Sequence, residues 1–215
     1  MNISVILFFL FNVLATAVLG IKFAIKRDDK IFKMFGIALI LNAIAFMIWS
    51  FGLIRPEILL ICVTLGTVTF LISLVFLFYT SIQKIESINI RRGLMVLCAI
   101  AVLGVFYIGN IDPVYAYISP EGYLFFNLGP LMQMLYVFIL ALVALPAVDL
   151  IASKFKSSYS LIFRYSLIAQ ICGGIMLITS KDSSVLYVTG LIIGFVYLLL
   201  LIIFIFNPKS WTKVN

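Results

Sequence analysis

Four polar side chains interrupt the apolar runs of this sequence and are its first candidates for chemistry: Asn12, Asn42, Thr67 and Gln170. Amide and hydroxyl groups donate and accept hydrogen bonds but carry no charge near neutral pH. We interpret them as groups that join helices through hydrogen bonds, each worth about 1 kcal/mol or less in a membrane. The alternative interpretation is that they form the polar lining of a ligand cavity.

The charged residues nearest to the interior of the apolar runs are Asp149 and Arg164, each about one helical turn from the end of its run. The two runs are consecutive, so antiparallel helices would bring both side chains to a similar depth. We expect an ion pair between helices, with the long arginine side chain reaching toward the interface. A gate or a proton relay is the alternative.

A third group of candidates lies in the longest connection, residues 110–129, which is rich in aromatic residues. Tyr115, Tyr117 and Tyr123 are its tyrosines, and the run Pro120, Glu121, Gly122 is typical of a turn. Tyrosine is enriched where a membrane meets water, so these residues predict an aromatic belt. Long structured loops often carry function, which keeps a lid over an outward-facing pocket as the alternative.

Several kinds of chemistry are excluded by residues that the sequence lacks. There is no histidine, and the three cysteines, Cys62, Cys98 and Cys172, are widely spaced within apolar runs. This excludes His-ligated haem, the common zinc sites and Ser-His or Cys-His catalysis. No Gly-rich nucleotide loop and no hydrolase motif occurs. We therefore expect no enzyme, no cofactor and no metal site.

The helices that position these candidate residues can be predicted from the composition. Of the 215 residues, 65% are hydrophobic and 11% are charged, whereas a soluble domain carries roughly 25% charged residues. Spanning a bilayer takes about 20 apolar residues in a helix, and seven runs qualify. The sequence predicts a single transmembrane domain over 1–215, an all-α integral membrane protein with a seven-transmembrane-helix bundle, whose helices lie at about 2–24, 32–54, 58–81, 93–109, 130–152, 160–179 and 185–206.

The net charge of +7 is distributed unevenly among the connections. Of the 15 basic residues, 13 fall on one side: Lys22, Lys26, Arg27, Lys30, Lys33, Lys84, Arg91, Arg92, Lys154, Lys156, Arg164, Lys209 and Lys213. The other side has Arg55 and Lys181, with the acids Glu57, Asp112, Glu121 and Asp182. Basic connections stay in the cytoplasm. We expect the N-terminus outside, the C-terminus cytoplasmic, a multi-pass location in the cell membrane and no nucleic-acid partner.

The last predicted helix, 185–206, contains no lysine, so it cannot form the Schiff base of a retinal protein. The proline-glutamine pairs of seven-helix sugar transporters are also absent. The third helix ends in Phe76, Leu77, Phe78, Tyr79 and Thr80, and a longer outer connection precedes the fifth. This layout resembles the seven-helix N-terminal membrane sensor region of prokaryotic histidine kinases. The resemblance implies sensing without catalysis, and because no kinase follows the helices, we expect no autonomous signalling.

Three functions fit these observations. The first is a non-enzymatic, sensor-like or accessory subunit that binds a small apolar ligand or a membrane partner. The second is a small-solute transporter or channel, which would need a polar path through the bundle. The third is a structural subunit of a larger membrane complex. The expected partners are the lipid bilayer and either a membrane protein or further copies of the chain.

Overall fold

The computed structural model describes residues 3–26, 29–111, 115–127, 129–155, 157–180 and 183–207. The remaining residues lie outside this description. Among them are seven that the charge argument used: Arg27, Asp112, Lys156, Lys181, Asp182, Lys209 and Lys213.

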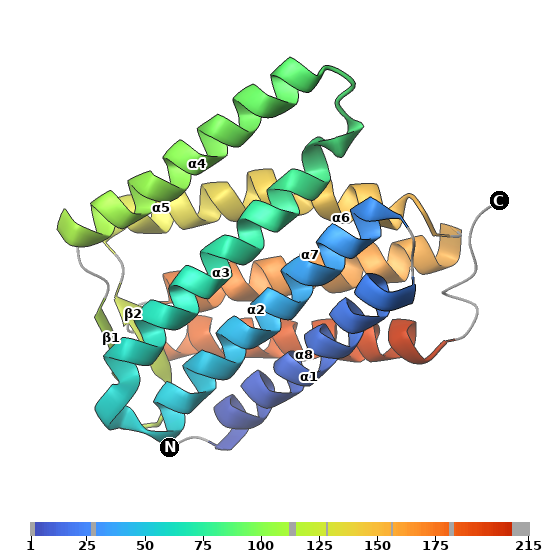
Figure 1. Ribbon diagram of the computed structural model, residues 1–215. Helices are drawn as coiled ribbons and strands as arrows, with labels where there is room; N and C mark the ends of the chain where they lie inside the picture. The colour runs from blue at the N-terminus through green and yellow to red at the C-terminus, as the bar shows by residue number, and fades with distance from the viewer. Residues whose placement is uncertain are drawn as a thin grey trace.

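The described chain is a bundle of long helices with one small hairpin (Figure 1). Six helical spans are long and apolar enough to cross a membrane, which makes the chain a multi-pass membrane bundle. Their helices are α1 (Ile3–Lys26), α2 (Lys30–Ile54), α3 (Leu59–Ser81), α4 (Ile88–Ile111), α7 (Ser157–Thr179) and α8 (Ser184–Phe206). Short 3₁₀ turns, η1 (Pro56–Ile58) and η2 (Ile82–Lys84), flank α3.

Two helices begin earlier than predicted. α4 begins at Ile88 and α7 at Ser157, whereas the apolar runs predicted starts near 93 and 160. The added turn of α4 contains Asn89, Arg91 and Arg92. A polar first turn continues the helix beyond the apolar part, and run length detects only the apolar part.

The predicted fifth helix is present as three successive helical pieces. These are α5 (Pro130–Ile139), a π-helical stretch η3 (Leu140–Ala144) and α6 (Leu145–Ala152). Pro146 is the second residue of α6, separated from the end of the π stretch by one residue. Its ring clashes with the carbonyl four residues back and it donates no backbone hydrogen bond, so a wider turn relieves the clash. A proline within a helix typically kinks it, and here the π stretch precedes Pro146.

The connection over residues 110–129 contains the one departure from all-α structure among the described residues. β1 (Tyr115–Ile118) pairs antiparallel with β2 (Leu124–Asn127), with Tyr115 opposite Asn127 and Ile118 opposite Leu124. The turn predicted at residues 120–122 joins the strands, and Gly122 has a φ of 83° that favours glycine. The strands themselves were not predicted, because four residues are too few to show a clear alternation.

Glycines set the spacing of neighbouring helices. A Cβ on Gly36 of α2 would lie 2.7 Å from both the Gly20 carbonyl oxygen and the Ala24 nitrogen of α1. A Cβ on Gly173 of α7 would lie 3.0 Å from the Gly190 carbonyl oxygen of α8. The backbones of α1 and α2, and of α7 and α8, therefore approach to contact, as small residues allow in membranes.

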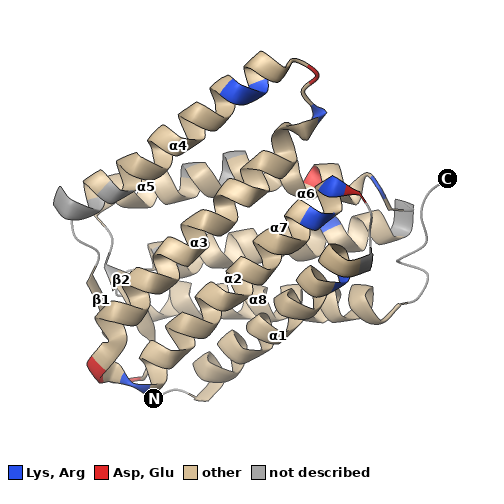
Figure 2. Cartoon of the chain, viewed as in Figure 1, with Lys and Arg blue, Asp and Glu red and all other residues tan. Residues whose placement is uncertain are grey.

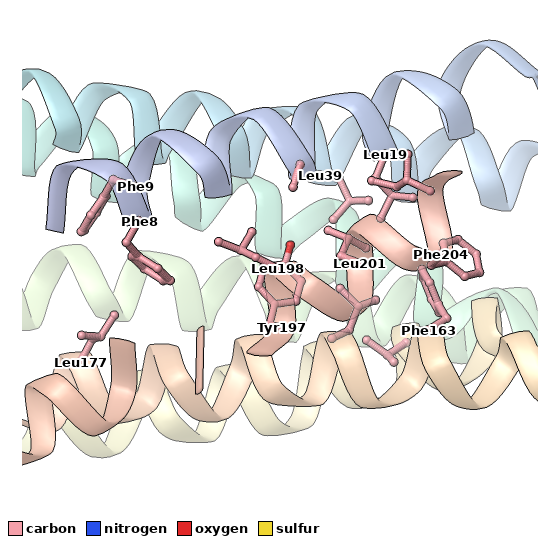
Figure 3. Packing of buried hydrophobic residues seen from close by; sticks show 14 of the residues in the cluster. Phe8, Phe9, Leu19, Leu39, Phe163, Leu177, Tyr197, Leu198, Leu201 and Phe204 are labelled. Atoms are coloured by element: carbon pink, nitrogen blue, oxygen red, sulfur yellow. The ribbon is translucent and has the colours of Figure 1, made fainter. Parts of the chain in front are cut away.

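Aromatic side chains fill the core at one end of the bundle. Side chains of α1, α7 and α8 meet in one buried cluster (Figure 3). One part of it is a group of six phenylalanines whose paired ring centroids lie 5.1–6.1 Å apart: Phe23, Phe32, Phe35, Phe155, Phe163 and Phe204. α4 lies at the edge of the bundle, and Val105 is the only buried side chain among its described residues.

We expect Gly36→Ala to destabilise the protein because its Cβ would overlap backbone atoms of α1. Overpacking of this kind costs about 1–3 kcal/mol. Gly104→Ala on α4 is the matched control, because its Cβ meets nothing within 4 Å. The control should be neutral or stabilising by up to about 1 kcal/mol, since alanine is the better helix former. Thermal unfolding in detergent measures both, and equal unfolding midpoints would contradict the close approach.

Candidate functional site

A cavity lies between α2, α3, α7 and the α5–η3–α6 segment. Its volume is about 140 Å³, close to the roughly 150 Å³ of an apolar cavity that holds one benzene molecule. Side chains from α1 and from strand β2 complete the wall. The cavity is therefore built by segments from most of the chain.

Three of the four predicted polar residues line this cavity. Asn42 comes from α2, Thr67 from α3 and Gln170 from α7. None of the described lining side chains is charged. The Oδ1 atom of Asn42 is buried and has no hydrogen-bond partner among the described residues. Buried polar atoms are nearly always paired, so this oxygen needs an explanation.

The fourth predicted residue, Asn12, is not among the lining residues. It is buried on α1, where its Oδ1 accepts a hydrogen bond from the Thr16 hydroxyl at 3.2 Å. The same hydroxyl also donates to the Asn12 backbone carbonyl. Asn12 is thus bonded within its own helix, and the structure does not bring it together with Asn42 and Gln170.

Four other polar side chains in the wall have partners in the protein: Ser73, Trp49, Tyr136 and Thr67. The Ser73 hydroxyl donates to the Phe70 carbonyl at 2.6 Å, and Trp49 Nε1 donates to the Val63 carbonyl at 3.4 Å. The Tyr136 and Thr67 side chains interact through their hydroxyl groups. These contacts leave the Asn42 oxygen as the lining atom with an unmet hydrogen bond.

One wall of the cavity is a row of aromatic rings. Phe9 lies 5.6 Å from Phe46, Phe46 lies 5.2 Å from Trp49, and Trp49 lies 5.9 Å from both Phe70 and Phe126, measured between ring centroids. All five rings line the cavity. The interplanar angles of 46–85° are typical of tilted and edge-to-face pairs. We name these five residues the aromatic wall.

The sequence did not single out the aromatic wall, although part of its signal is visible there. Asn42, Phe46 and Trp49 follow at spacings of four and three, which places them on one face of α2. Phe126 has no such signal, because it reaches the cavity from strand β2.

The predicted tyrosines of the outer connection do not line the cavity. Tyr115 and Tyr117 are 61% and 39% exposed, and Tyr123 packs against Tyr187 with ring centroids 5.1 Å apart. The hairpin instead buries Leu124 and Phe125 and contributes Phe126 to the cavity wall. In the turn, a hydrogen bond with the Ser119 side chain lowers the pKa of Glu121.

Asp149 and Arg164 are brought together at the end of the bundle that carries most of the charge (Figure 2). Arg164 Nη2 lies 2.9 Å from Asp149 Oδ1, and Lys84 Nζ of η2 lies 3.8 Å from Asp149 Oδ2. The Asp149 side chain is 58% exposed, so each contact is worth at most about 1 kcal/mol. The pair ties α6 to α7 and to the end of α3.

A second ion pair at this end joins Asp29 to Lys154. Asp29 also caps α2, accepting a hydrogen bond from the Ile31 N–H at 2.8 Å. Burial raises the pKa of Asp29, but the Lys154 ammonium and the N–H groups of Ile31 and Phe32 outweigh it and leave the pKa below its ordinary value. Both ion pairs are structural links outside the cavity.

The described residues contain no group of three or more His, Cys, Asp or Glu side chains that could hold a metal ion. No protein-family model matches the chain, and no curated protein or solved structure matches it. The cavity is therefore the feature of the molecule that points to a function.

We expect Asn42→Leu to stabilise the protein by about 1 kcal/mol or more, because an unpaired buried polar group costs about 1–3 kcal/mol. Asn12→Leu is the matched control, and it should bring no gain because the Asn12 oxygen already has a partner. Thermal unfolding of the two variants in one detergent makes the comparison. A loss of stability in Asn42→Leu as large as in Asn12→Leu would show that Asn42 is satisfied in the folded protein.

Proposed function

We propose that this protein binds a small apolar ligand inside the membrane and acts as a non-enzymatic, sensor-like or accessory subunit. The observation that carries the proposal is the cavity, with its aromatic wall, its neutral polar groups and no charged lining among the described residues. Ligand sites are typically concave and mostly apolar, with a few polar groups that fix orientation. A conducting path would need more polar or charged lining than these residues provide, which favours binding over transport.

The proposed placement in the membrane has seven spans. Six are the long spans α1, α2, α3, α4, α7 and α8. We infer that the seventh is the α5–η3–α6 segment, whose 10, 5 and 8 residues make a helical rod long enough to cross about 30 Å of hydrocarbon.

The proposed orientation puts the basic end of the bundle in the cytoplasm of the cell. Figure 2 shows the lysines and arginines gathered near the ends of α1, α3 and α6 and the starts of α2 and α4. Arg55, in contrast, caps the opposite end of α2. This distribution favours a cytoplasmic C-terminus, with the N-terminus and the hairpin outside.

A sensor needs a link between its ligand and its cytoplasmic end, and α6 provides a candidate. Val148 lines the cavity, and the next residue, Asp149, pairs with Arg164 and Lys84. The π stretch η3 also lines the cavity through Leu140 and Ala144, and π segments within helices are frequent at functional sites. A ligand that displaced α6 would therefore disturb the charged contacts at its end.

Filling the cavity tests the proposed function. Gly174 lines the cavity, and a Cβ there meets nothing within 4 Å, so Gly174→Leu should fill the space without breaking the helix. In a Trp211→Phe background the remaining tryptophan, Trp49, belongs to the cavity wall and reports on binding. We expect bromobenzene to quench Trp49 fluorescence saturably, and Gly174→Leu to abolish the saturable part.

Gly104→Leu on the edge helix α4 is the control for this experiment, because it makes the same substitution in open space away from the cavity. In this variant, bromobenzene should quench Trp49 fluorescence as strongly as it does in the parent protein. Quenching that rises linearly in every variant would reflect partition into detergent alone and would contradict ligand binding.

Cysteine labelling tests the proposed orientation. With Cys62, Cys98 and Cys172 replaced by alanine, single cysteines are introduced at Glu121 in the hairpin turn and at Glu86 before α4, both exposed. An impermeant maleimide should label the Glu121→Cys protein in intact cells and the Glu86→Cys protein only after permeabilisation. The reverse pattern would place the basic end outside.

A further inference from the structure

The cavity also limits which ligands can bind. We infer that its ligand is a neutral, single-ring aromatic molecule that carries one hydroxyl group, a phenol in chemical class. This inference rests on the proposed ligand-binding function and names the substrate class of the same site. Size, wall chemistry and the unpaired Asn42 oxygen each contribute one part of it.

Volume sets the size of the ligand. The cavity of about 140 Å³ is close to the roughly 150 Å³ that accommodates one benzene ring. A steroid or a long acyl chain exceeds that space, whereas a single water uses only about 10–15 Å³ of it. The fitting ligand is therefore one ring with a small substituent.

The aromatic wall sets the shape of the ligand. Its rings already meet one another at tilted and edge-to-face angles, with centroids 5.2–5.9 Å apart. Such pairs add about 0.5–1.5 kcal/mol beyond the burial of area, so a flat ring that continues the row gains more than an aliphatic chain of equal volume. Apolar side chains such as Leu39 and Leu140 form other parts of the lining.

The charge of the ligand follows from the side chains around it. The described lining holds no acid and no base, and a charge buried without a partner is strongly disfavoured. Carboxylates and aliphatic ammonium groups are therefore excluded, and the ligand is neutral at the pH where it binds.

The Asn42 side chain determines which polar group the ligand carries. Its buried Oδ1 has no partner among the described residues and needs a hydrogen-bond donor. Rotation of the amide about its last bond exchanges the oxygen for the NH₂ group, which needs an acceptor. A hydroxyl group both donates and accepts, so it satisfies Asn42 in either orientation. A ketone or an ether would satisfy only one of them.

The test compares 4-bromophenol, bromobenzene and 4-bromobenzoate as quenchers of Trp49 in the Trp211→Phe protein near pH 7, where a phenol stays neutral. Asn42→Leu should weaken saturable 4-bromophenol quenching about tenfold, the effect of losing one hydrogen bond worth about 1.4 kcal/mol. Leucine at position 42 also changes the space for any ligand, so bromobenzene serves as the reference probe, and the ratio of 4-bromophenol to bromobenzene affinity should fall about tenfold. Each probe partitions into detergent equally in both samples. The change in its quenching between the two proteins therefore reports binding alone. 4-Bromobenzoate should give no saturable quenching in either protein.

The outcomes separate this inference from the function beneath it. If Asn42→Leu weakens both neutral probes equally or neither of them, the phenol inference is wrong while apolar ligand binding stands. Saturable quenching by 4-bromobenzoate would overturn the requirement for a neutral ligand. If no probe quenches saturably in the parent protein, the proposed function fails as well. Asn42→Ala serves as the second variant if Asn42→Leu does not fold.

Discussion

Contact between helix backbones at glycines is the constraint on which the rest of the bundle depends. Gly20 with Gly36 brings α1 against α2, and Gly173 with Gly190 brings α7 against α8. In lipid there is little hydrophobic force between helices, so close packing of this kind supplies much of the attraction. These two close helix pairs determine the positions of the helix faces that lie outside the two contacts. Between α2, which contributes Phe46 and Trp49, and α7, which contributes Gln170 and Gly174, the packing leaves a cavity.

The cavity shows how few polar groups the interior contains. Ser73 and Trp49 bond to nearby carbonyls, and Thr67 interacts with Tyr136. Asn42 alone among the lining residues has a buried oxygen without a partner. Functional sites often contain features that lower the stability of the fold, and interactions elsewhere in the protein offset that loss. The glycine contacts and the phenylalanine cluster at the charged end provide that compensation here.

Much of the helical plan could be predicted from run length, including the 130–152 segment that the π stretch interrupts. The cavity could be predicted only in part. Asn42, Thr67 and Gln170 could be recognised as polar residues in apolar runs. Which face of each helix points into the bundle could not be predicted. On α2, Ile44 is exposed while Ala43 and Ala45 are buried, and all three are apolar. Because lipid and protein interior select the same residues, composition does not distinguish an inward face from an outward one. Phe126 depends on a hairpin register that so short a strand does not reveal.

The central claim is that the space beside Asn42 and the aromatic wall receives a small apolar molecule from the membrane. Crystals of the protein grown in a lipid phase and soaked with bromobenzene test it most directly, through the anomalous scattering of bromine. The account predicts one strong bromine peak inside the cavity, bordered by Trp49 and Gly174, which line it. Bromine peaks confined to the lipid-facing surface, with the cavity empty or filled by side chains, would contradict it.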